Sequence, residues 1–196
     1  MRLHIAARGD AGVTDEKLMV DVRSGDVRQL AQLFDRHHGS LFRYSMRMTG
    51  NREWSEDLVQ EIFCRILRYR DTFRDGHLFT TWMFRIARNT FVDHTRKRRW
   101  EVQKDDTMDS PVMPENNLEQ EQDLQLLRQA LLRLPVEQRE LLVLARFQQL
   151  PYTEIAALLE IEVGTVKTRV HRAVKLLRDI YLELSAPPVT RPAHGV

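Results

Sequence analysis

The sequence predicts an all-α protein made of two small helical domains that a flexible acidic linker joins. Hydrophobic residues make up 42% of the 196 residues, which is enough for a core. The chain has only eight glycines and none between Gly76 and Gly164, whereas short strands are usually joined by glycine-rich turns. Apolar residues recur at helical spacing on both sides of residues 101–117, which are acidic and contain two prolines.

The first domain is expected to span residues 26–100, preceded by a tail and a short helix in residues 1–25. Thr14 and Asp26 are of the residue types that cap helix N-termini, and Gly50 is of the type that ends a helix. Together with the apolar spacing, these positions predict helices over Asp15–Arg23, Val27–His37 and Leu41–Met48.

The clearest helix of this domain follows Ser55, which is expected to cap it. Apolar residues recur there at i, i+4 and i+8, and Cys64 falls among them, which predicts a reduced cysteine in the core. Residues 71–80 are expected to form a loop, after which Thr80 or Thr81 caps the next helix. The residues of that helix expected to point inward are Met83, Ile86, Ala87 and Val92.

The second domain is expected to span residues 118–184, between the linker and a disordered, proline-containing tail at residues 185–196. Its first helix carries regularly spaced leucines and ends at Pro135. Val136–Gln148 is expected to form the next helix.

The strongest local signal is a helix-turn-helix in the segment YTEIAALLEIEVGTVKTRVHRAVKLLR. Ala156 leaves room for the second helix to cross, and Ile161 fills the turn. Glu160 occupies a turn position that favours a left-handed backbone, which costs a glutamate about 1 kcal/mol relative to glycine. Because Pro151 precedes the first helix, Thr153 is expected to cap it. The second helix is expected to bury Val166, Val170, Ala173, Val174 and Leu177.

The charges are unevenly distributed although the net charge is only +2. Residues 64–100 hold ten Lys/Arg against three Asp/Glu, and residues 101–123 hold eight acids against one lysine. Residues 163–178 hold five basic residues and no acid. Two basic blocks around an acidic spacer indicate two contacts with a polyanion, and solvated helix faces are an equally weighted alternative from charge alone.

The sequence carries no enzyme or metal motif that we recognise. The adjacent pairs His37-His38 and Asp93-His94 point to different helix faces and do not form one metal site, and the single cysteine excludes an internal disulfide. We therefore expect no catalytic residue, no cofactor and no metal. No apolar stretch has the length of a signal peptide or a membrane span, which predicts a cytoplasmic protein without membrane insertion.

Two long segments resemble sigma factors, the bacterial proteins that direct RNA polymerase to promoters. LPVEQRELLVLARFQQLPYTEIAALLEIEVGTVKTRVHRAVKLLR resembles sigma region 4 of the extracytoplasmic-function (ECF) group of the sigma-70 family. LFDRHHGSLFRYSMRMTGNREWSEDLVQEIFCRILRYRDTF, followed by TTWMFRIARNTFVDHTRKRR, resembles sigma region 2. The resemblance covers roughly residues 28–180 in the family order. It implies that the chain binds core polymerase and recognises the −10 and −35 promoter elements.

The resemblance assigns a polymerase-docking role to the helix that follows Ser55. Exposed acids and an amide would suit a basic coiled-coil partner on the polymerase, and a solvated face of little energetic value is the alternative. The matching positions are Asp57, Leu58, Gln60, Glu61, Phe63 and Arg65.

The loop before the TTWMF helix and the helix itself match the part of the family that opens and reads the −10 element. Aromatic and basic side chains suit single strands, where stacking contributes ~1–3 kcal/mol per base. Phe79 and Trp82 are alternatively core residues, and the core is the favoured place for Trp82. The matching positions are His77, Leu78, Phe79, Arg85, Arg88, Asn89, Lys97 and Arg98.

The second helix of the helix-turn-helix matches the family's −35 reader. A major groove admits such a helix, with its N-terminal residues at base edges and Lys or Arg on phosphates. Arg169 lies beside the buried stripe and alternatively pairs with an acid. The matching positions are Thr165, Lys167, Thr168, Arg169, His171, Arg172 and Lys175.

The partners that follow from the resemblance are the β′ clamp and β flap of core polymerase, promoter DNA and an anti-sigma factor. Each domain offers few base contacts, so we expect strong promoter binding only when polymerase holds both domains. The main rival is a conventional dimeric repressor or activator, which would bind an operator tightly by itself. An enzyme, and a protein that sequesters a partner without touching DNA, are weaker rivals.

Overall fold

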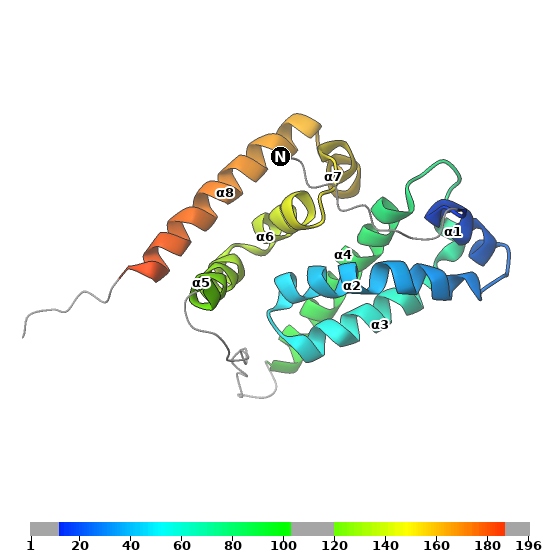
Figure 1. The fold of residues 1–196 in the computed structure, drawn as a ribbon, viewed down its shortest axis with the longest axis horizontal. Helices are drawn as coiled ribbons and strands as arrows, with labels where there is room; N and C mark the ends of the chain where they lie inside the picture. The colour runs from blue at the N-terminus through cyan, green and yellow to red at the C-terminus, as the bar shows by residue number, and fades with distance from the viewer. Residues whose placement is uncertain (1–11, 103–119, 187–196) are drawn as a thin grey trace, which may run out of the picture.

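Every regular element is helical within residues 12–102 and 120–186, which the computed structural model describes (Figure 1). This confirms the predicted all-α class. The expected tails and most of the expected linker, at residues 1–11, 187–196 and 103–117, lie outside the described residues. The first domain contains α1 (Asp15–Arg23), α2 (Gln29–Thr49), α3 (Arg52–Arg68), the 3₁₀ turn η1 (Arg70–Thr72) and α4 (Phe79–Val102). The second contains α5 (Gln120–Arg133), α6 (Val136–Leu142), the π-helical turn η2 (Val143–Phe147), α7 (Tyr152–Leu159) and α8 (Val163–Ser185).

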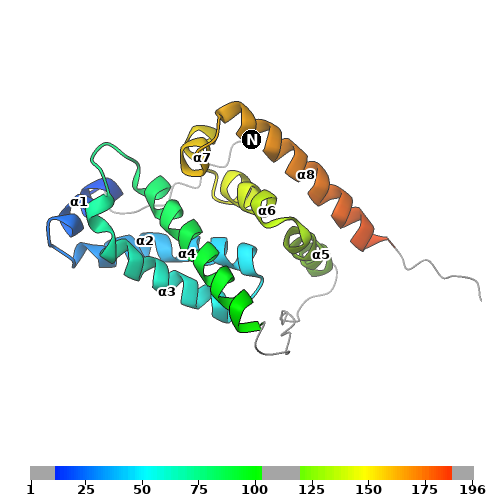
Figure 2. The same cartoon turned by 180° about the vertical axis from the view of Figure 1, so that it is seen from behind.

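Helices α2, α3 and α4 pack side by side, and their apolar stripes form the core of the first domain (Figures 1 and 2). The stripe predicted on α3 is confirmed, because Leu58, Ile62 and Ile66 are each at most 1% exposed. Cys64 is exposed, so its predicted core position is wrong. It lies two residues from both isoleucines, and two residues turn a helix by about 200°, to the opposite face.

The expected break between two helices at residues 38–40 is absent, since α2 runs unbroken from Gln29 to Thr49. Leu33 and Leu41, on either side, are both fully buried. A single glycine inside a helix costs only about 1 kcal/mol, so burial on both sides of Gly39 is sufficient to keep the helix continuous. Gly50 ends α2 in a left-handed conformation, as predicted.

The N-terminal caps of the helices differ in part from the predictions. Thr14 caps α1 as expected, by accepting a 3.2 Å hydrogen bond from the Lys17 N–H. Asn51, rather than Ser55, caps α3, because its side chain accepts a 2.8 Å bond from the Trp54 N–H. Ser55 is buried inside the helix and donates to the Asn51 carbonyl at 2.6 Å. Asn51 comes earlier in the chain and is an equally good cap, so the helix starts there.

The other expected caps are also wrong. Asp26 lies outside the cap position, because α2 begins at Gln29 after Arg28, and its carboxylate accepts from the side chains of Arg28 and Gln29. Helix α4 begins at Phe79, before either expected threonine, and the Phe79 N–H donates to the Glu16 carboxylate at 3.1 Å. Helix α7 begins at Tyr152 without a side-chain cap from Thr153.

In each domain, one residue that was expected to point into the core is exposed instead. In α4, Val92 is 47% exposed, and Phe91 is buried in its place at 4%. In α8, Val174 is 42% exposed, whereas Val166, Val170 and Ala173 are buried as predicted. In both cases the neighbouring residue, Phe91 or Ala173, occupies the buried stripe, and the valine after it lies outside the stripe.

Helix α1 is tied to α2 through Asp15. Its carboxylate accepts a 2.8 Å bond from Arg36 and lies 2.6 Å from His37 Nε2. The hydrogen bond with His37 and the Arg36 guanidinium hold the pKa of Asp15 below its ordinary value of 3.8, against the effect of partial burial. Leu18, Met19 and Val22 of α1 are fully buried against the domain.

Asp15→Asn is expected to lower the free energy of unfolding near neutral pH by about 0.5–1 kcal/mol, since the pair is partly solvent-screened. A native pKa below the unfolded value gives stability that is present above the unfolded pKa and lost as the pH falls through the native one. The difference between wild type and variant should therefore shrink below pH 3.8. Urea unfolding at several pH values measures it. Asp21→Asn, whose partner Lys17 is 62% exposed, is the control and should have a smaller effect.

The two domains pack against one another along α2 and α4. Helix α2 contacts α5, α6 and η2, and α4 contacts α7. At Gly50, with φ of 69°, a Cβ would lie 2.5 Å from the end of the Leu132 side chain, so another residue there would displace Leu132 and adopt a strained backbone. Arg139, on α6, donates to the carbonyls of Met48 at the end of α2 and of Leu132 and Leu134 at the end of α5.

Candidate nucleic-acid interface

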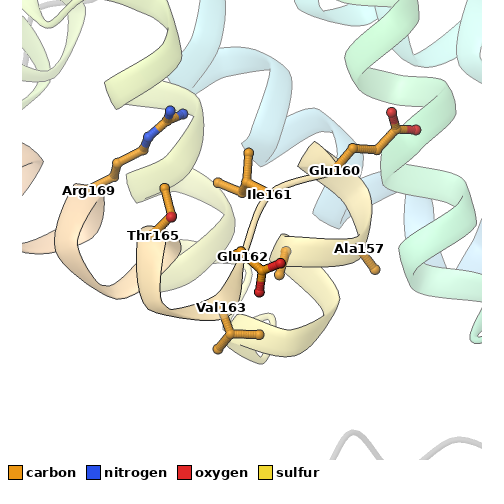
Figure 3. A pocket seen from close by; sticks show the side chains of 8 residues that line it. Ala157, Glu160, Ile161, Glu162, Val163, Thr165 and Arg169 are labelled. Atoms are coloured by element: carbon orange, nitrogen blue, oxygen red, sulfur yellow. The ribbon is translucent and has the colours of Figure 1, made fainter.

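The turn between α7 and α8 fixes the direction of the second helix. Glu160 adopts φ of 56° and ψ of 44°, the left-handed conformation that the sequence predicts for this position. Ile161 packs against the core, so the turn is anchored. Figure 3 shows Glu160 and Arg169 on opposite sides of this turn. No ion pair joins Arg169 to an acid in the part of the chain that the structure describes, so the alternative role weighed for it is not observed.

Helix α8 presents one apolar and one basic face. The buried Val166, Val170 and Ala173 lie toward the rest of the second domain, and α8 packs on α5, α6 and α7. In both overall views α8 runs along the outer edge of the molecule, away from the first domain (Figures 1 and 2). Of the residues that the sequence assigns to −35 DNA, Thr165 is half-buried and the exposed ones are Lys167, Thr168, Arg169, His171, Arg172 and Lys175.

The residues of the loop and helix start expected at the −10 element divide between surface and core. His77 is exposed and Leu78 is 49% exposed, whereas Phe79 is fully buried. The Phe79 ring lies 5.2 Å from that of His37 and 6.4 Å from that of Phe73. In this structure Phe79 therefore belongs to the core and cannot stack on a base, although it positions the loop before it.

The polar residues of α4 expected at the −10 element lie in three environments. Arg85 donates to the Ala157 carbonyl of the second domain at 2.9 Å, and Arg88 donates to the Glu140 carboxylate at 3.1 Å. Asn89 and Lys97 are exposed. Arg98 lies 4.7 Å over the ring of Trp54, which itself stacks on Phe91 at 5.9 Å.

The polymerase candidates on α3 likewise combine exposed and buried side chains. Asp57 and Gln60 are exposed, while Leu58 and Phe63 are only 1% and 7% exposed. Arg65 bonds both Glu61 and Asp93 at 2.7 Å and so connects α3 to α4. A docking partner would meet Asp57 and Gln60 directly and would find Arg65 already paired.

Sequence reasoning missed Glu140, the most buried carboxylate at the contact between the domains. It is 6% exposed and accepts hydrogen bonds from Tyr44 at 3.2 Å and Arg88 at 3.1 Å. Burial raises the pKa of Glu140 above its ordinary value, and Arg88 partly opposes this. The same burial and the nearby carboxylate raise the pKa of Tyr44 well above 10. The available signal was an acid inside the apolar segment LPVEQRELLVLARF.

The described residues contain no cluster of His, Cys, Asp and Glu suited to a metal ion. None of the helices in the described ranges is long and apolar enough to cross a membrane. The exposed candidate residues carry basic side chains on α4 and α8 and a carboxylate and an amide on α3.

Comparisons with known proteins match both halves of the chain. The family model described as Sigma-70 region 2 matches residues 33–101, and that described as Sigma-70, region 4 matches residues 124–177. The ECF RNA polymerase sigma factor SigW of Bacillus subtilis is 32% identical over 176 residues, which cover 83% of this chain and 94% of SigW. The ECF sigma factor EcfG of Rhodopseudomonas palustris is 38% identical over 150 residues, which cover 74% of this chain and 81% of EcfG.

Solved structures share the fold. The sigma factor RpoE from Bartonella quintana, in a co-crystal structure with the anti-sigma factor NepR, superposes with a TM-score of 0.67 at 29% identity. The match covers 81% of this chain and 99% of the RpoE chain. The similarity thus extends over both helical domains.

Proposed function

This chain belongs to the ECF group of sigma-70 RNA polymerase sigma factors, and we propose that α8 and the exposed residues of α4 are its promoter-reading elements. As a sigma factor it directs core RNA polymerase to promoters. The observation that carries the proposal for α8 is its exposed basic face, which holds no acid between residues 163 and 178. Lys167, Arg172 and Lys175 neutralise phosphates, and Thr165 and Thr168 lie near the N-terminus, where base edges come within reach.

The −10 element is bound by the face of α4 and the loop before it. Leu78 and His77 at the loop are positioned for unstacked bases, and Arg88, Asn89 and Lys97 for the strand backbone. Phe79 supports this loop from the core. Arg98 and Trp54 together offer a cation stacked on an aromatic ring, which suits a nucleotide at the far end of α4.

Core polymerase is bound by α3 through its exposed Asp57 and Gln60, with the β′ clamp as partner, while the second domain meets the β flap. An anti-sigma factor controls the chain, as the co-crystal structure of RpoE with NepR suggests by similarity. The chain performs no chemical step of its own and acts in the cytoplasm, where its polymerase is.

In vitro transcription with sigma-free core polymerase on a library of genomic fragments tests the function. We expect discrete start sites that require this protein, because each domain alone makes too few contacts and polymerase holds both at a fixed spacing. The control is core polymerase alone. Tight binding of the isolated chain to one duplex site, without new start sites, would instead indicate a conventional repressor or activator.

A further inference from the structure

The loop before α4 is exposed between two buried anchors. Residues 74–78 are all exposed, whereas Phe73 before them and Phe79 after them are 1% and 0% exposed. Within the loop, Gly76 has a left-handed φ of 80°, and a Cβ there would meet no atom within 4 Å. The positions of the two loop residues proposed to meet unstacked bases therefore depend on how the ends of the loop are held.

Helix α1 holds the first end of the loop through Arg23. The Arg23 guanidinium donates to the Phe73 carbonyl at 2.7 Å and to the Asp75 carboxylate at 2.8 Å. The Asp75 side chain is 73% exposed, so water screens this ion pair and it contributes little. The bond to the Phe73 carbonyl is partly buried and has a charged donor, so we expect it to be the stronger of the two.

The same helix holds the second end of the loop through Glu16. Its carboxylate accepts a 3.1 Å hydrogen bond from the N–H of Phe79, the first residue of α4. The first backbone N–H groups of a helix have no partner inside the helix, and the helix dipole favours a negative charge beside them. Glu16 therefore fixes the point at which the loop ends and α4 begins.

One helix thus bridges the loop from end to end. Glu16 and Arg23 are seven residues apart, which is about two turns, so they lie on one face of α1 and about 10 Å apart along its axis. Helix α1 is itself anchored, because Leu18, Met19 and Val22 are each at most 1% exposed. A helix held in this way keeps its length and so fixes the distance between the two ends of the loop.

We propose that α1 is a positioning element for this loop: Glu16 and Arg23 hold its two ends, so that His77 and Leu78 meet unstacked bases in one conformation. The proposal rests on the proposed role of the loop at the −10 element. A flexible loop must be ordered before it can bind, and this ordering lowers the affinity. If releasing both ends leaves roughly one molecule in ten in the binding conformation, the affinity for a single strand falls about tenfold.

A pair of spin labels measures the conformation of the loop. With Cys64→Ser removing the exposed native thiol, Arg74→Cys places one label in the loop and Glu53→Cys places the other in the first turn of α3. Both positions are exposed, and the rise per residue places Glu53 about 22 Å from the end of α3 that leads toward the loop. The otherwise unchanged chain should give one narrow distance distribution.

Glu16→Ala combined with Arg23→Ala should broaden this distribution, because both ends of the loop are released. Lys17→Ala combined with Asp21→Ala is the matched control: it also removes one base and one acid from α1, at a separate ion pair of 2.7 Å, and should leave the distribution narrow. An unchanged distribution in the Glu16 and Arg23 variant overturns the proposal, and so does equal broadening in the control.

DNA binding by the polymerase complex separates positioning from general stability. The probes are a single strand spanning the −10 element and a duplex spanning the −35 element of one promoter found in the transcription assay. The Glu16 and Arg23 variant should bind the single strand about tenfold more weakly than the control variant does, and the duplex equally well. A broadened loop with unchanged single-strand affinity, or an equal loss on both probes, overturns the positioning role.

Single substitutions decide the question if circular dichroism shows that the double variant has lost helix. Glu16→Gln keeps an oxygen that can accept from the Phe79 N–H and should bind the single strand as wild type does, whereas Glu16→Ala should bind it several-fold more weakly. Equal single-strand binding by these two variants overturns the role of Glu16. Failure of the transcription assay would contradict the proposed function but would not alter the distance measurement, so the two failures are distinguishable.

Discussion

Replacing Lys167, Arg172 and Lys175 by alanine is expected to weaken promoter binding by the polymerase complex on the order of a hundredfold, or about 3 kcal/mol. All three side chains are exposed on the basic face of α8, and the buried stripe of that helix is untouched. The slope of log affinity against log salt should fall by about 3, because each lost cation releases one counterion fewer. Filter binding and abortive transcription over a salt series measure both quantities.

The matched control removes the same charge from elsewhere in the second domain. Arg128, Arg133 and Arg146 are exposed on α5 and η2, and their triple alanine variant should bind promoters within a few-fold of wild type. If the α8 triple variant keeps full promoter output, or if both triple variants lose it equally, α8 does not read the −35 element.

Phe79→Ala is expected to lower the free energy of unfolding by about 3–5 kcal/mol, since it removes a large side chain from a filled core. Phe79 is 0% exposed and lies within 6.4 Å of the rings of His37, Phe73 and Trp82, measured between centroids. Urea unfolding followed by circular dichroism measures the loss. Transcription by this variant should fall at 37 °C and recover in part at lower temperature.

Leu78→Ala separates a core role from a DNA role at this loop. Leu78 is 49% exposed, so the substitution should change stability by no more than about 0.5 kcal/mol. A defect of this variant in promoter opening would then belong to the DNA contact. A Phe79→Ala protein that keeps wild-type stability and yet fails to open promoters would contradict the core assignment and return Phe79 to the −10 site.

The structure confirms the features that depend on the local spacing of apolar and polar residues. The apolar stripe of α3, the basic face of α8 and the left-handed Glu160 each follow from residues within a few turns of one another. Caps were less predictable, because Asn51 and Ser55 are both good candidates and only the earlier one starts the helix. Cys64 and Val92 were misplaced for a related reason: both are apolar neighbours of a buried stripe but lie outside its arc.

Contacts between the domains were beyond the reach of sequence patterns. Glu140 and Arg88 are 52 residues apart, and Glu140 and Tyr44 are 96 apart. A glutamate in an apolar segment indicates an unusual environment but does not identify its partner. Phe79 shows the converse, since an aromatic residue beside a basic helix suits bases and core equally well until its neighbours are known.

The three carbonyls that accept from Arg139 determine which hydrogen bonds would remain if the two domains separated. One of them, that of Met48, belongs to the first domain, and those of Leu132 and Leu134 belong to the second. Were the domains to part, the guanidinium would keep two acceptors, and only the Met48 carbonyl would need a water molecule in its place. Neither half is left with a bare cation in an apolar surrounding. Any separation of the domains should therefore proceed without local unfolding, and amide hydrogens inside α2 and α6 should remain protected from exchange.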